Sequence, residues 1–401
     1  MDINYIEKLK EDATTELKDN ILAFWMNNTL DLENGGIYGK LTNSNKIDKK
    51  APKGCILNSR VLWTFSNAYR TFKDEKYLKV AKITYDYLIK YFYDEEFKGL
   101  YWMVDYKGNP IDVKKQMYNL SFGIYGLTEY YRATGVKEAL DKAIEIYQVI
   151  EKYSYDEKNK GYIEALERDW SKISDSRLSY KEPNCSKTMN THLHILESYT
   201  NLYRVWKDDS FKLKFKELIE VIMDHIIDHN TYQFKLFFND DWNSLEDVIS
   251  FGHDIEGSWL LYEAALILGD SEVIEKAKIF SIKMAEKVYA DGIDREKGGL
   301  YNEIKDGKLD SHKAWWPQAE TLVGFINAFE LTGDEKFLKE TYKMWDYIQR
   351  VFVNKEFGEW YSVVSLEGKV IEEVPKVEPW KCPYHNGRCC FEIIERLNKI
   401  K

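Results

Sequence analysis

The sequence predicts an all-α protein, an (α/α)6 barrel built from six helix-pair repeats, with short extended segments at the end that holds the functional site. Two observations carry this prediction. A glycine followed by aliphatic or aromatic residues returns roughly every sixty residues, and the apolar residues between these markers recur at three- and four-residue spacing. Because such a unit cannot bury its apolar face alone, we expect residues 1–401 to form one domain.

The glycine markers define the six units. Phe234-Lys235-Leu236 lacks the glycine but lies midway in a gap about two repeats long, so we count it as a member. The other five markers are Gly36-Ile37-Tyr38, Gly99-Leu100-Tyr101, Gly161-Tyr162-Ile163, Gly299-Leu300-Tyr301 and Gly358-Glu359-Trp360.

Within each unit, the spacing predicts two helices. Leu57 to Phe72 and Tyr118 to Thr134 are apolar at helical spacing. Lys73-Asp74-Glu75 and Gly135-Val136-Lys137 follow them as helix stop and start signals. Periodicity alone permits an open solenoid or a closed ring, but aromatic-rich linkers that recur at one end favour a ring with a central pit.

Composition limits the partners and the compartment. A formal net charge of −10 argues against nucleic acid, since phosphate binding needs a basic face. No apolar run approaches the roughly 18 residues of a membrane span, and Met1-Asp2-Ile3-Asn4-Tyr5 does not begin an export signal. The five cysteines fit free thiols in a reducing compartment. We expect a cytoplasmic monomer or weak homo-oligomer that contacts neither nucleic acid nor membrane.

Aromatic residues make up 15% of the chain, more than a helical core requires. Flat rings pack well against the apolar faces of sugars, although core filling is the alternative for any one of them. Trp315, Trp316 and Trp380 lie close to polar motif residues and are therefore candidates for ligand contact.

Four of the seven histidines lie in three short stretches. Imidazole exchanges a proton near neutral pH, so this clustering indicates proton-transfer chemistry. The stretches are Asn190-Thr191-His192-Leu193-His194, Phe251-Gly252-His253-Asp254-Ile255-Glu256 and Trp380-Lys381-Cys382-Pro383-Tyr384-His385-Asn386-Gly387-Arg388.

Helical geometry separates these histidines by role. Asn190 and His194 share a face, whereas His192 is turned about 200° from His194, so we expect His194 in the site and His192 in a structural role. Glu256 lies one turn from His253, where a carboxylate can fix the ring tautomer and raise its basicity. This pair is the candidate general base.

His385 lies in a loop-like stretch between prolines and the basic Arg388, a setting in which functional side chains are displayed. Arg60 and Tyr118 begin apparent helices and are possible donors to an oxygen-rich ligand. Either could instead be an ordinary cap or ion-pair residue.

We expect neither a metal nor a nucleotide cofactor. His192-x-His194 cannot ligate one ion with both rings on a helix, and His225 to His229 lacks the glutamate of the HExxH pattern. No GxGxxG follows a predicted strand, and no GxxxxGK[ST] occurs. The chemistry must come from side chains.

Five stretches in order, spanning nearly the whole chain, resemble the N-acylglucosamine 2-epimerase superfamily, most closely its cellobiose 2-epimerase branch. They are Lys53-Gly54-Cys55-Ile56-Leu57-Asn58-Ser59-Arg60, Lys187-Thr188-Met189-Asn190, Gly252-His253-Asp254-Ile255-Glu256, Trp315-Trp316-Pro317-Gln318-Ala319-Glu320 and the stretch from Trp380 to Arg388.

The resemblance implies an (α/α)6 barrel and epimerisation at C2 of the reducing-end glucose of β-1,4-linked disaccharides, without a cofactor. Cellobiose would give glucosyl-mannose, and lactose would give epilactose. The family's acid/base histidines match His253 and His385, and a third essential histidine matches His194. Its sugar-contacting positions match Arg60, Tyr118, Asn190, Glu256, Trp316 and Trp380. We add Trp315, Glu320 and Arg388, which lie in the same motifs, as candidate substrate-binding residues.

The reaction implied by the resemblance begins with ring opening, because a closed pyranose has no acidic proton at C2. His385 would assist that opening, and His253 backed by Glu256 would remove the C2 proton to give a cis-enediolate. Arg60 and His194 would stabilise the developing oxyanion. How the two acid/base histidines divide the faces of C2 is left open.

Three alternatives remain at this point. An aldose–ketose isomerase would use the same scaffold and histidines but return the proton to C1. A glycoside hydrolase would need two carboxylates about 5 to 10 Å apart, for which Asp254, Glu256 and Glu320 are candidates, and would leave the histidines unexplained. A non-catalytic sugar-binding protein would need no paired histidines.

Overall fold

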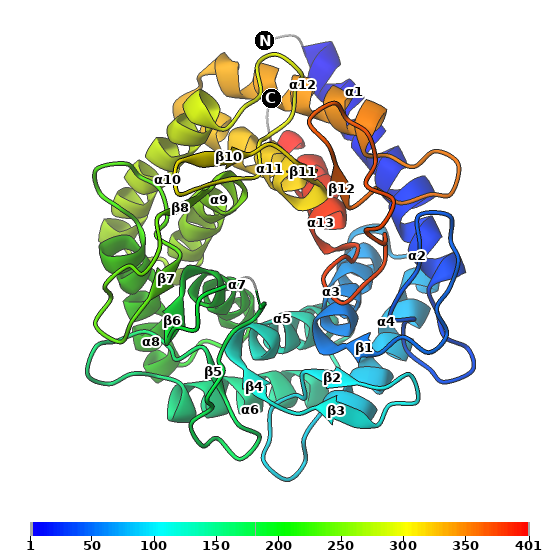
Figure 1. The fold of residues 1–401 in the computed structure, drawn as a ribbon, viewed down its shortest axis with the longest axis vertical. Coiled ribbons are helices and arrows are strands. Elements are labelled where there is room, and N and C mark those ends of the chain that lie inside the picture. The colour runs from blue at the N-terminus through cyan, green and yellow to red at the C-terminus, as the bar shows by residue number, and fades with distance from the viewer. Residues whose placement is uncertain (1–2, 181, 400–401) are drawn as a thin grey trace.

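The computed structural model describes residues 3–180 and 182–399; Met1 and Asp2, considered above as part of the N-terminal segment, lie outside this range. Within it, six inner helices surround a central axis and a second layer of helices surrounds them (Figure 1). The inner helices are α3 Cys55–Phe72, α5 Met117–Thr134, α7 Met189–Val205, α9 Phe251–Leu268, α11 Trp315–Thr332 and α13 Tyr384–Leu397.

The outer layer is more amphipathic and carries π-helical turns in three of its members. Its elements are α1 Ile3–Thr15, η1 Glu16–Leu22 and α2 Ala23–Asn28, then α4 Glu75–Tyr87 with η2 Leu88–Phe92, α6 Lys137–Tyr153, α8 Asp209–Val221 with η3 Ile222–Ile226, α10 Ser271–Asp291 and α12 Glu335–Val351.

The ring is closed through the two ends of the chain. Each inner helix contacts the next, α13 contacts α3, and α1 packs on α13 as its outer partner. The predicted (α/α)6 barrel is therefore confirmed, and the sixth helix pair joins the N-terminal and C-terminal helices. That the whole chain acts as one domain stays a prediction.

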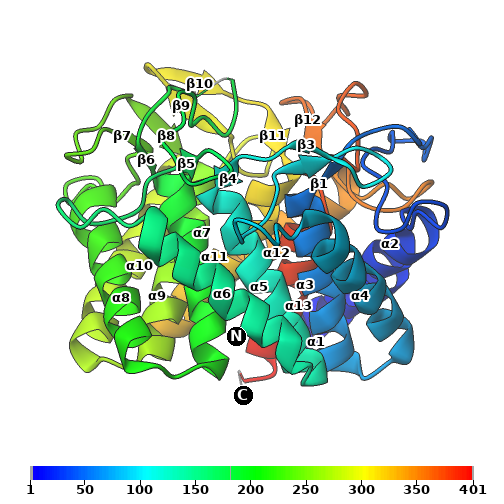
Figure 2. The same cartoon turned by 90° about the horizontal axis from the view of Figure 1, so that it is seen from below.

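Short strands and long connections gather at one end of the barrel, whereas both termini lie at the other (Figure 2). The strands pair antiparallel as β1-β2-β3, β4-β5, β6-β7, β8-β9-β10 and β11-β12. They are β1 Lys53–Gly54, β2 Met103–Val104, β3 Pro110–Asp112, β4 Lys115–Gln116, β5 Ala165–Leu166, β6 Lys187–Thr188, β7 Phe237–Phe238, β8 Val248–Ser250, β9 Glu303–Lys305, β10 Lys308–Asp310, β11 Lys313–Ala314 and β12 Val363–Val364.

An isolated β-bridge after each outer helix confirms the six-unit repeat. Phe234 bridges Ile227 in the unit that lacks the glycine, so its assignment as the missing member is correct. Gly161 illustrates why glycine is favoured here: its φ is +74°, and a Cβ there would lie 2.6 Å from His192 Nε2. The equivalent bridges are Leu30↔Ile37, Tyr93↔Leu100, Tyr155↔Tyr162, Ile293↔Leu300 and Val353↔Trp360.

A buried lysine holds most of these turns to the inner helix that follows. Lys313 Nζ lies 2.8 Å from Asp294 Oδ2 and donates to Gly298 O, with the ammonium fully buried. We call this pair of contacts the lysine brace. The same brace joins Lys53 to Asp31, Lys115 to Asp94 and Lys187 to Asp156, and Lys381 reaches Glu359 in the last unit.

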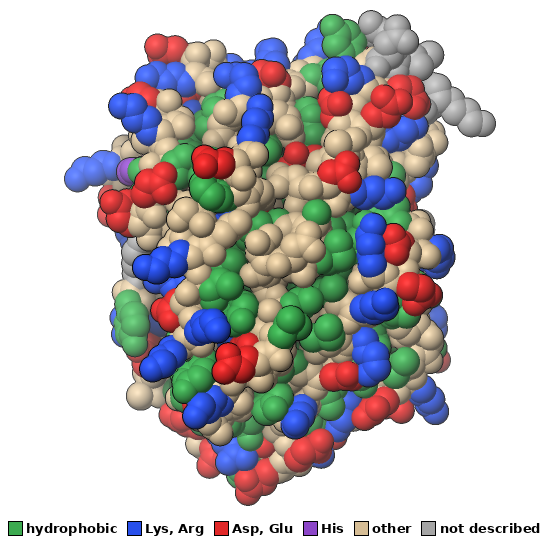
Figure 3. All heavy atoms as spheres, turned by 90° about the vertical axis from the view of Figure 1, so that its right-hand side faces the viewer, with side chains coloured by type: hydrophobic (Ala, Val, Ile, Leu, Met, Phe, Trp, Pro, Cys, Tyr) green, Lys and Arg blue, Asp and Glu red, His purple; other side chains and the backbone are tan. Residues whose placement is uncertain are grey.

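One face of the outer surface carries side chains of both charges (Figure 3). On the face in Figure 3, acidic and basic side chains are interspersed between apolar ones. The five cysteines, all within the described residues, are buried and free, as predicted. None of the helices in residues 3–180 and 182–399 combines the length and apolar character that a membrane span requires.

Candidate active site

A cavity of about 250 Å³ lies at the strand-bearing end of the barrel, where the N-termini of the inner helices converge. We call it the upper cavity. Because helix N-termini carry partial positive charge, this end of the ring favours negative charge in a ligand. Ten predicted residues line it: Arg60, Tyr118, Asn190, His194, His253, Glu256, Trp315, Trp316, Trp380 and His385.

His194 is held by a carboxylate that the sequence analysis missed. Its Nδ1 lies 2.9 Å from Glu197 Oε2, one turn along α7, and both side chains are buried. The Tyr118 ring packs edge-on against the imidazole at 4.8 Å between centroids. Asn190 lines the same cavity, so its shared face with His194 is confirmed.

His385 is held in the same way from a different helix. Its Nδ1 lies 2.7 Å from Oε1 of Glu320 on α11. Glu320 is not among the residues that line the cavity, and its carboxylate lies behind the histidine, so its predicted contact with substrate stays a prediction. Its other oxygen accepts from Trp259 Nε1 at 3.0 Å, which fixes the carboxylate in place.

The predicted pairing of Glu256 with His253 is wrong. His253 Nδ1 lies 2.8 Å from Ser250 Oγ, at the residue that precedes α9. Trp316 packs on His253 at 4.7 Å and on His385 at 5.6 Å between centroids, so one indole contacts both imidazoles. Gly252 permits this approach, because a Cβ there would lie 2.6 Å from the Trp316 ring.

Arg388 lies beneath the upper cavity and organises three carboxyl groups. Nη2 donates to Glu256 Oε1 at 2.6 Å and to Glu320 Oε1 at 2.7 Å, while Nη1 contacts Glu197 and Tyr384. The side chain is 1% exposed and does not line the cavity, so the expected substrate contact is replaced by a supporting role. We call Glu197, Glu256, Glu320 and Arg388 the central layer.

Among the described residues, two carboxylates of the central layer and the adjacent His385 have the spacing of metal ligands. Oxygen or nitrogen atoms of Glu256, Glu320 and His385 lie within 4.8 Å of one another. The Arg388 guanidinium bonds both carboxylates, and so already supplies the positive charge that a cation would bring.

Burial keeps the three histidines uncharged at neutral pH. It lowers the pKa of His253 to about 3, assisted by the nearby His194. Burial, together with Arg60 and Arg388, lowers the pKa of His385 well below its usual range. Burial also lowers the pKa of His194, although Glu197 opposes the change. A neutral imidazole is the form that can accept a proton.

The surroundings of two carboxyl groups in the central layer shift their pKa values in opposite directions. Burial and the neighbouring Glu320 raise the pKa of Glu256 well above its usual value, despite Arg388. Burial acts in the same direction on Glu197, but Arg388 and the hydrogen bond from His194 outweigh it and lower the Glu197 pKa. The pKa values of Glu256 and Glu197 therefore move apart, although both side chains bond the same guanidinium.

Several buried polar atoms at the upper cavity lack a hydrogen-bond partner within the described residues. They are Asn190 Oδ1, Glu256 Oε2 and Arg60 Nε. Arg60 is otherwise fixed, since Nη2 donates to Tyr118 Oη at 2.7 Å and Nη1 donates to Trp380 O. Buried polar groups are rarely left unsatisfied, so these atoms indicate a polar, hydroxyl-rich ligand.

Comparison with known proteins decides the family. The N-acylglucosamine 2-epimerase family model matches residues 36–389. A cellobiose 2-epimerase of Bacteroides fragilis is 45% identical over 389 residues, which cover 97% of this chain and 99% of its own. A cellobiose 2-epimerase structure from Bacillus thermoamylovorans B4167 matches with a TM-score of 0.94 at 43% identity, over 97% of this chain and 100% of that chain.

This chain belongs to the N-acylglucosamine 2-epimerase family. It is an isomerase of the epimerase type. A D-mannose isomerase structure has a TM-score of 0.83 at 20% identity over 98% of this chain and 97% of that one, and this likeness concerns the fold alone.

Other residues of the epimerase lie near the site. One was predicted to be structural, and the rest were not identified from the sequence. His192 is structural, as expected: Nδ1 contacts Thr188 O at 2.6 Å and Nε2 accepts from Tyr162 N. Glu197 was missed, although its spacing from His194 equals that of Glu256 from His253. The missed cavity residues Leu178, Ser179 and Glu182 come from a connection without periodic signal.

The carboxyl groups suggested for hydrolysis are all engaged in this epimerase. Glu256 and Glu320 share one nitrogen of Arg388. Asp254 is fully buried and does not line the upper cavity. Its carboxylate accepts hydrogen bonds from Phe234 N and Gln233 Nε2. This arrangement differs from the two separate carboxyl groups that flank a scissile bond in glycosidases.

Proposed function

We propose that this enzyme epimerises C2 of the reducing-end glucose of β-1,4-linked disaccharides, converting cellobiose to glucosyl-mannose and lactose to epilactose. One observation carries the proposal: three uncharged imidazoles line one cavity, and two of them are held at Nδ1 by carboxylates. The relatives that share 39% to 45% identity with this chain are cellobiose 2-epimerases, which supports the same substrate class.

The hydrogen bond at Nδ1 determines which ring nitrogen of a histidine can accept a proton. A carboxylate only accepts, so Nδ1 of His385 carries the proton given to Glu320, and Nε2 keeps the lone pair. The same holds for His194 with Glu197. His253 contacts a serine hydroxyl, which can donate or accept, so its tautomer is not fixed by a charge. The Glu320 carboxylate therefore presents Nε2 of His385 as the nitrogen that can accept a proton.

The reaction needs acid–base catalysis but no change of oxidation state overall. In ring opening the bond between C1 and the ring oxygen breaks, the ring oxygen takes up a proton, and loss of the anomeric hydroxyl proton leaves an aldehyde at C1, which makes the C2 proton acidic. A histidine then removes that proton, the electron pair moves toward the C1 oxygen, and a cis-enediolate forms. Proton return to the opposite face of C2, followed by ring closure, gives the mannose epimer. His253 and His385, which both contact Trp316, would share these steps.

The other cavity residues would stabilise the charge that develops on oxygen. Arg60 is held by Tyr118 and Trp380, which orients its guanidinium before substrate arrives. The inner-helix N-termini add to this stabilisation. Asn190 and Glu256 would hydrogen-bond sugar hydroxyls through their unpartnered oxygens, and the indole rings of Trp316 and Trp380 would pack on the sugar faces.

Product analysis of histidine variants tests the proposal. Incubation with cellobiose, followed by NMR of the sugars, should yield glucosyl-mannose from the unaltered enzyme and none from His253→Ala or His385→Ala with the fold retained. His312→Ala is the matched control, because that histidine is exposed and pairs with Asp310. A ketose as the main product would identify an isomerase, and free glucose would identify a hydrolase.

A further inference from the structure

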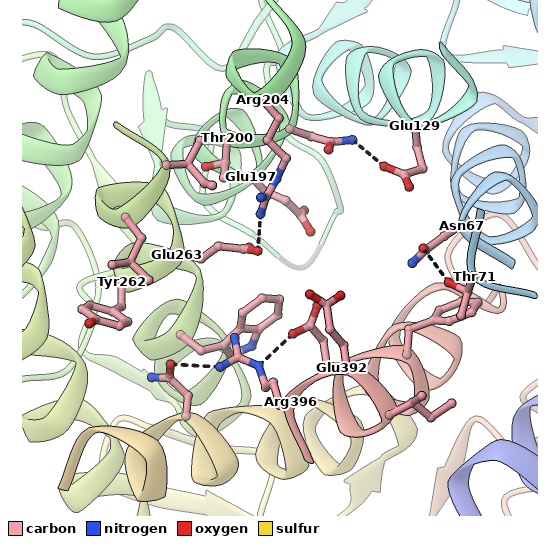
Figure 4. A pocket seen from close by; sticks show the side chains of 18 of the residues that line it. Asn67, Thr71, Glu129, Glu197, Thr200, Arg204, Tyr262, Glu263, Glu392 and Arg396 are labelled. Carbon is pink, nitrogen blue, oxygen red and sulfur yellow. Dashed lines mark hydrogen bonds and ion pairs between the residues drawn. The ribbon is translucent and has the colours of Figure 1, made fainter. Parts of the chain in front are cut away.

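A second and larger cavity, of about 670 Å³, lies at the opposite end of the barrel. We call it the lower cavity. The C-terminal halves of all the inner helices line it, and side chains from several of them point into one common space (Figure 4). Leu266, 48% exposed, and the exposed Lys399 lie at its rim, so it opens to solvent at the end away from the strands.

The charges that line the lower cavity are neutralised by one another. Arg204 lies 2.5 Å from Glu263, and Arg396 lies 2.5 Å from Glu330. Arg70 and Arg132 both pair with Glu129. An anionic ligand would compete with these carboxylates and meet the negative ends of the helix dipoles. A cationic ligand would have to displace the guanidiniums, so the pairing favours an uncharged ligand.

The remaining surface suits hydroxyl groups and flat apolar faces. Among the bonds formed within the described residues, Arg204 donates through Nη2 alone, which leaves Nε and Nη1 for a ligand. Thr200, Asn67 and Asn327 add polar groups to the wall. Trp63, Trp259 and Tyr262 add aromatic rings. Guanidinium, carboxylate and amide groups beside aromatic rings are the combination that binds carbohydrates.

The lower cavity also reaches the supports of the catalytic histidines. Glu197 lines it and holds His194 through Oε2. Trp259 lines it and donates to Glu320, which holds His385. The central layer thus separates the two cavities. One residue that supports each histidine, Glu197 for His194 and Trp259 for His385, lines the lower cavity.

We propose that the lower cavity is a second saccharide site, which takes a neutral mono- or disaccharide in contact with Glu197 and Trp259. Its volume exceeds that of the upper cavity, about 670 Å³ against about 250 Å³, so a disaccharide fits within it. The ligand class follows from the cavity's own lining. The comparison of size with the upper cavity and the choice of cellobiose as a probe rest on the proposed function.

Binding stoichiometry tests this second site. Equilibrium dialysis of the His253→Ala protein against radiolabelled cellobiose counts equivalents bound per chain without turnover. We expect two equivalents for His253→Ala and one for His253→Ala/Thr200→Trp, because an indole at position 200 would fill the lower cavity, where Thr200 now forms part of the wall. The matched control is His253→Ala/Thr200→Val, which keeps the side-chain volume and should bind two.

The outcomes separate this site from the proposed function. One equivalent in all three proteins, with no effect of the tryptophan, would overturn the second site. If the upper cavity did not bind cellobiose, the valine variant would bind one equivalent and the tryptophan variant none. Should Thr200→Trp fail to fold, Ile267→Trp fills the same cavity from α9, and we expect the same loss of one equivalent.

Discussion

At the scale of single residues, the site is defined by which group holds each histidine. Glu197 and Glu320 hold His194 and His385 at Nδ1, whereas Ser250 contacts His253. A carboxylate at Nδ1 fixes the tautomer and stabilises the imidazolium that forms when Nε2 takes a proton. The two carboxylates are therefore positioning residues that act through the histidines.

The Glu320→Gln variant should test this positioning role. The amide can still accept a hydrogen bond but carries no charge, so the imidazolium of His385 loses its partner. We expect kcat to fall by about 10² to 10⁴-fold, the range for general acid–base groups, with little change in KM. The measurement is steady-state kinetics with cellobiose.

Glu164→Gln is the control for this variant. Glu164 is equally buried, burial raises its pKa to about 7, and its partners are Gln116, Thr188 and Thr191 with no histidine among them. Its kcat should stay within about twofold of the unaltered enzyme, since no acid–base group is touched. Equal losses of kcat in both variants would show that Glu320 contributes only to packing.

The pH dependence of kcat/KM should reflect the lowered pKa values of the buried histidines. An ordinary imidazole loses its basic form as pH falls through about 6.5, but burial lowers the pKa of His253 to about 3 and that of His385 well below normal. The neutral, active form therefore persists in acid. We expect kcat/KM for cellobiose to stay flat from pH 8 to about 5 and to fall only below that. An acid limb centred near pH 6.5 would contradict these pKa values.

The sequence supplied the histidines and their faces but not their partners. The separation of His192 from His194 follows from helix geometry alone, and the structure agrees. The same geometry allowed Glu256 to reach His253, but Arg388 from α13 binds that carboxyl instead. Local spacing limits which contacts are possible, and tertiary neighbours decide which form.

At the scale of elements, the lysine brace links the N-termini of four inner helices, α3, α5, α7 and α11, to the preceding turns. The lysine lies two residues before the helix and the aspartate lies in the preceding turn, so each brace joins one unit to the next. The fourth unit departs from this pattern: Ile249 replaces the lysine, and Asp228 pairs with Lys235, whose side chain is 42% exposed. No sequence expectation covered the brace, because its partners lie 19 to 31 residues apart.

Lys313→Met should lower the free energy of unfolding by about 3 kcal/mol, because removing one partner of a buried pair leaves Asp294 charged and uncompensated. Lys82→Met is the matched control, since the Lys82–Asp86 pair has the same chemistry but both side chains are more than half exposed. Its cost should stay below about 1 kcal/mol. Urea denaturation measures both, and equal costs would show that burial does not set the value of the brace.

At the scale of the whole molecule, the barrel places the two cavities on opposite sides of one charged layer. The repeat could be predicted because the glycine marker recurs in five of the six units and helix stop and start signals lie between the markers. The pairing of α1 with α13 could not, since it joins the first and last helices and leaves no periodic signal. Beside that pair, Glu359 follows α12 and has a φ of +66°. Its carboxylate accepts hydrogen bonds from Trp25 and Lys381, which link the two ends of the chain across the closed ring.

Deuterium incorporation tests the central claim most directly. The enzyme is incubated with cellobiose in D2O, and the sugars are analysed by NMR and mass spectrometry. Proton transfer by the histidines of the upper cavity predicts deuterium at C2 in both the glucose-ended and the mannose-ended disaccharide. Epimer formation without deuterium at C2, or deuterium at C1 of a ketose product, would contradict the account.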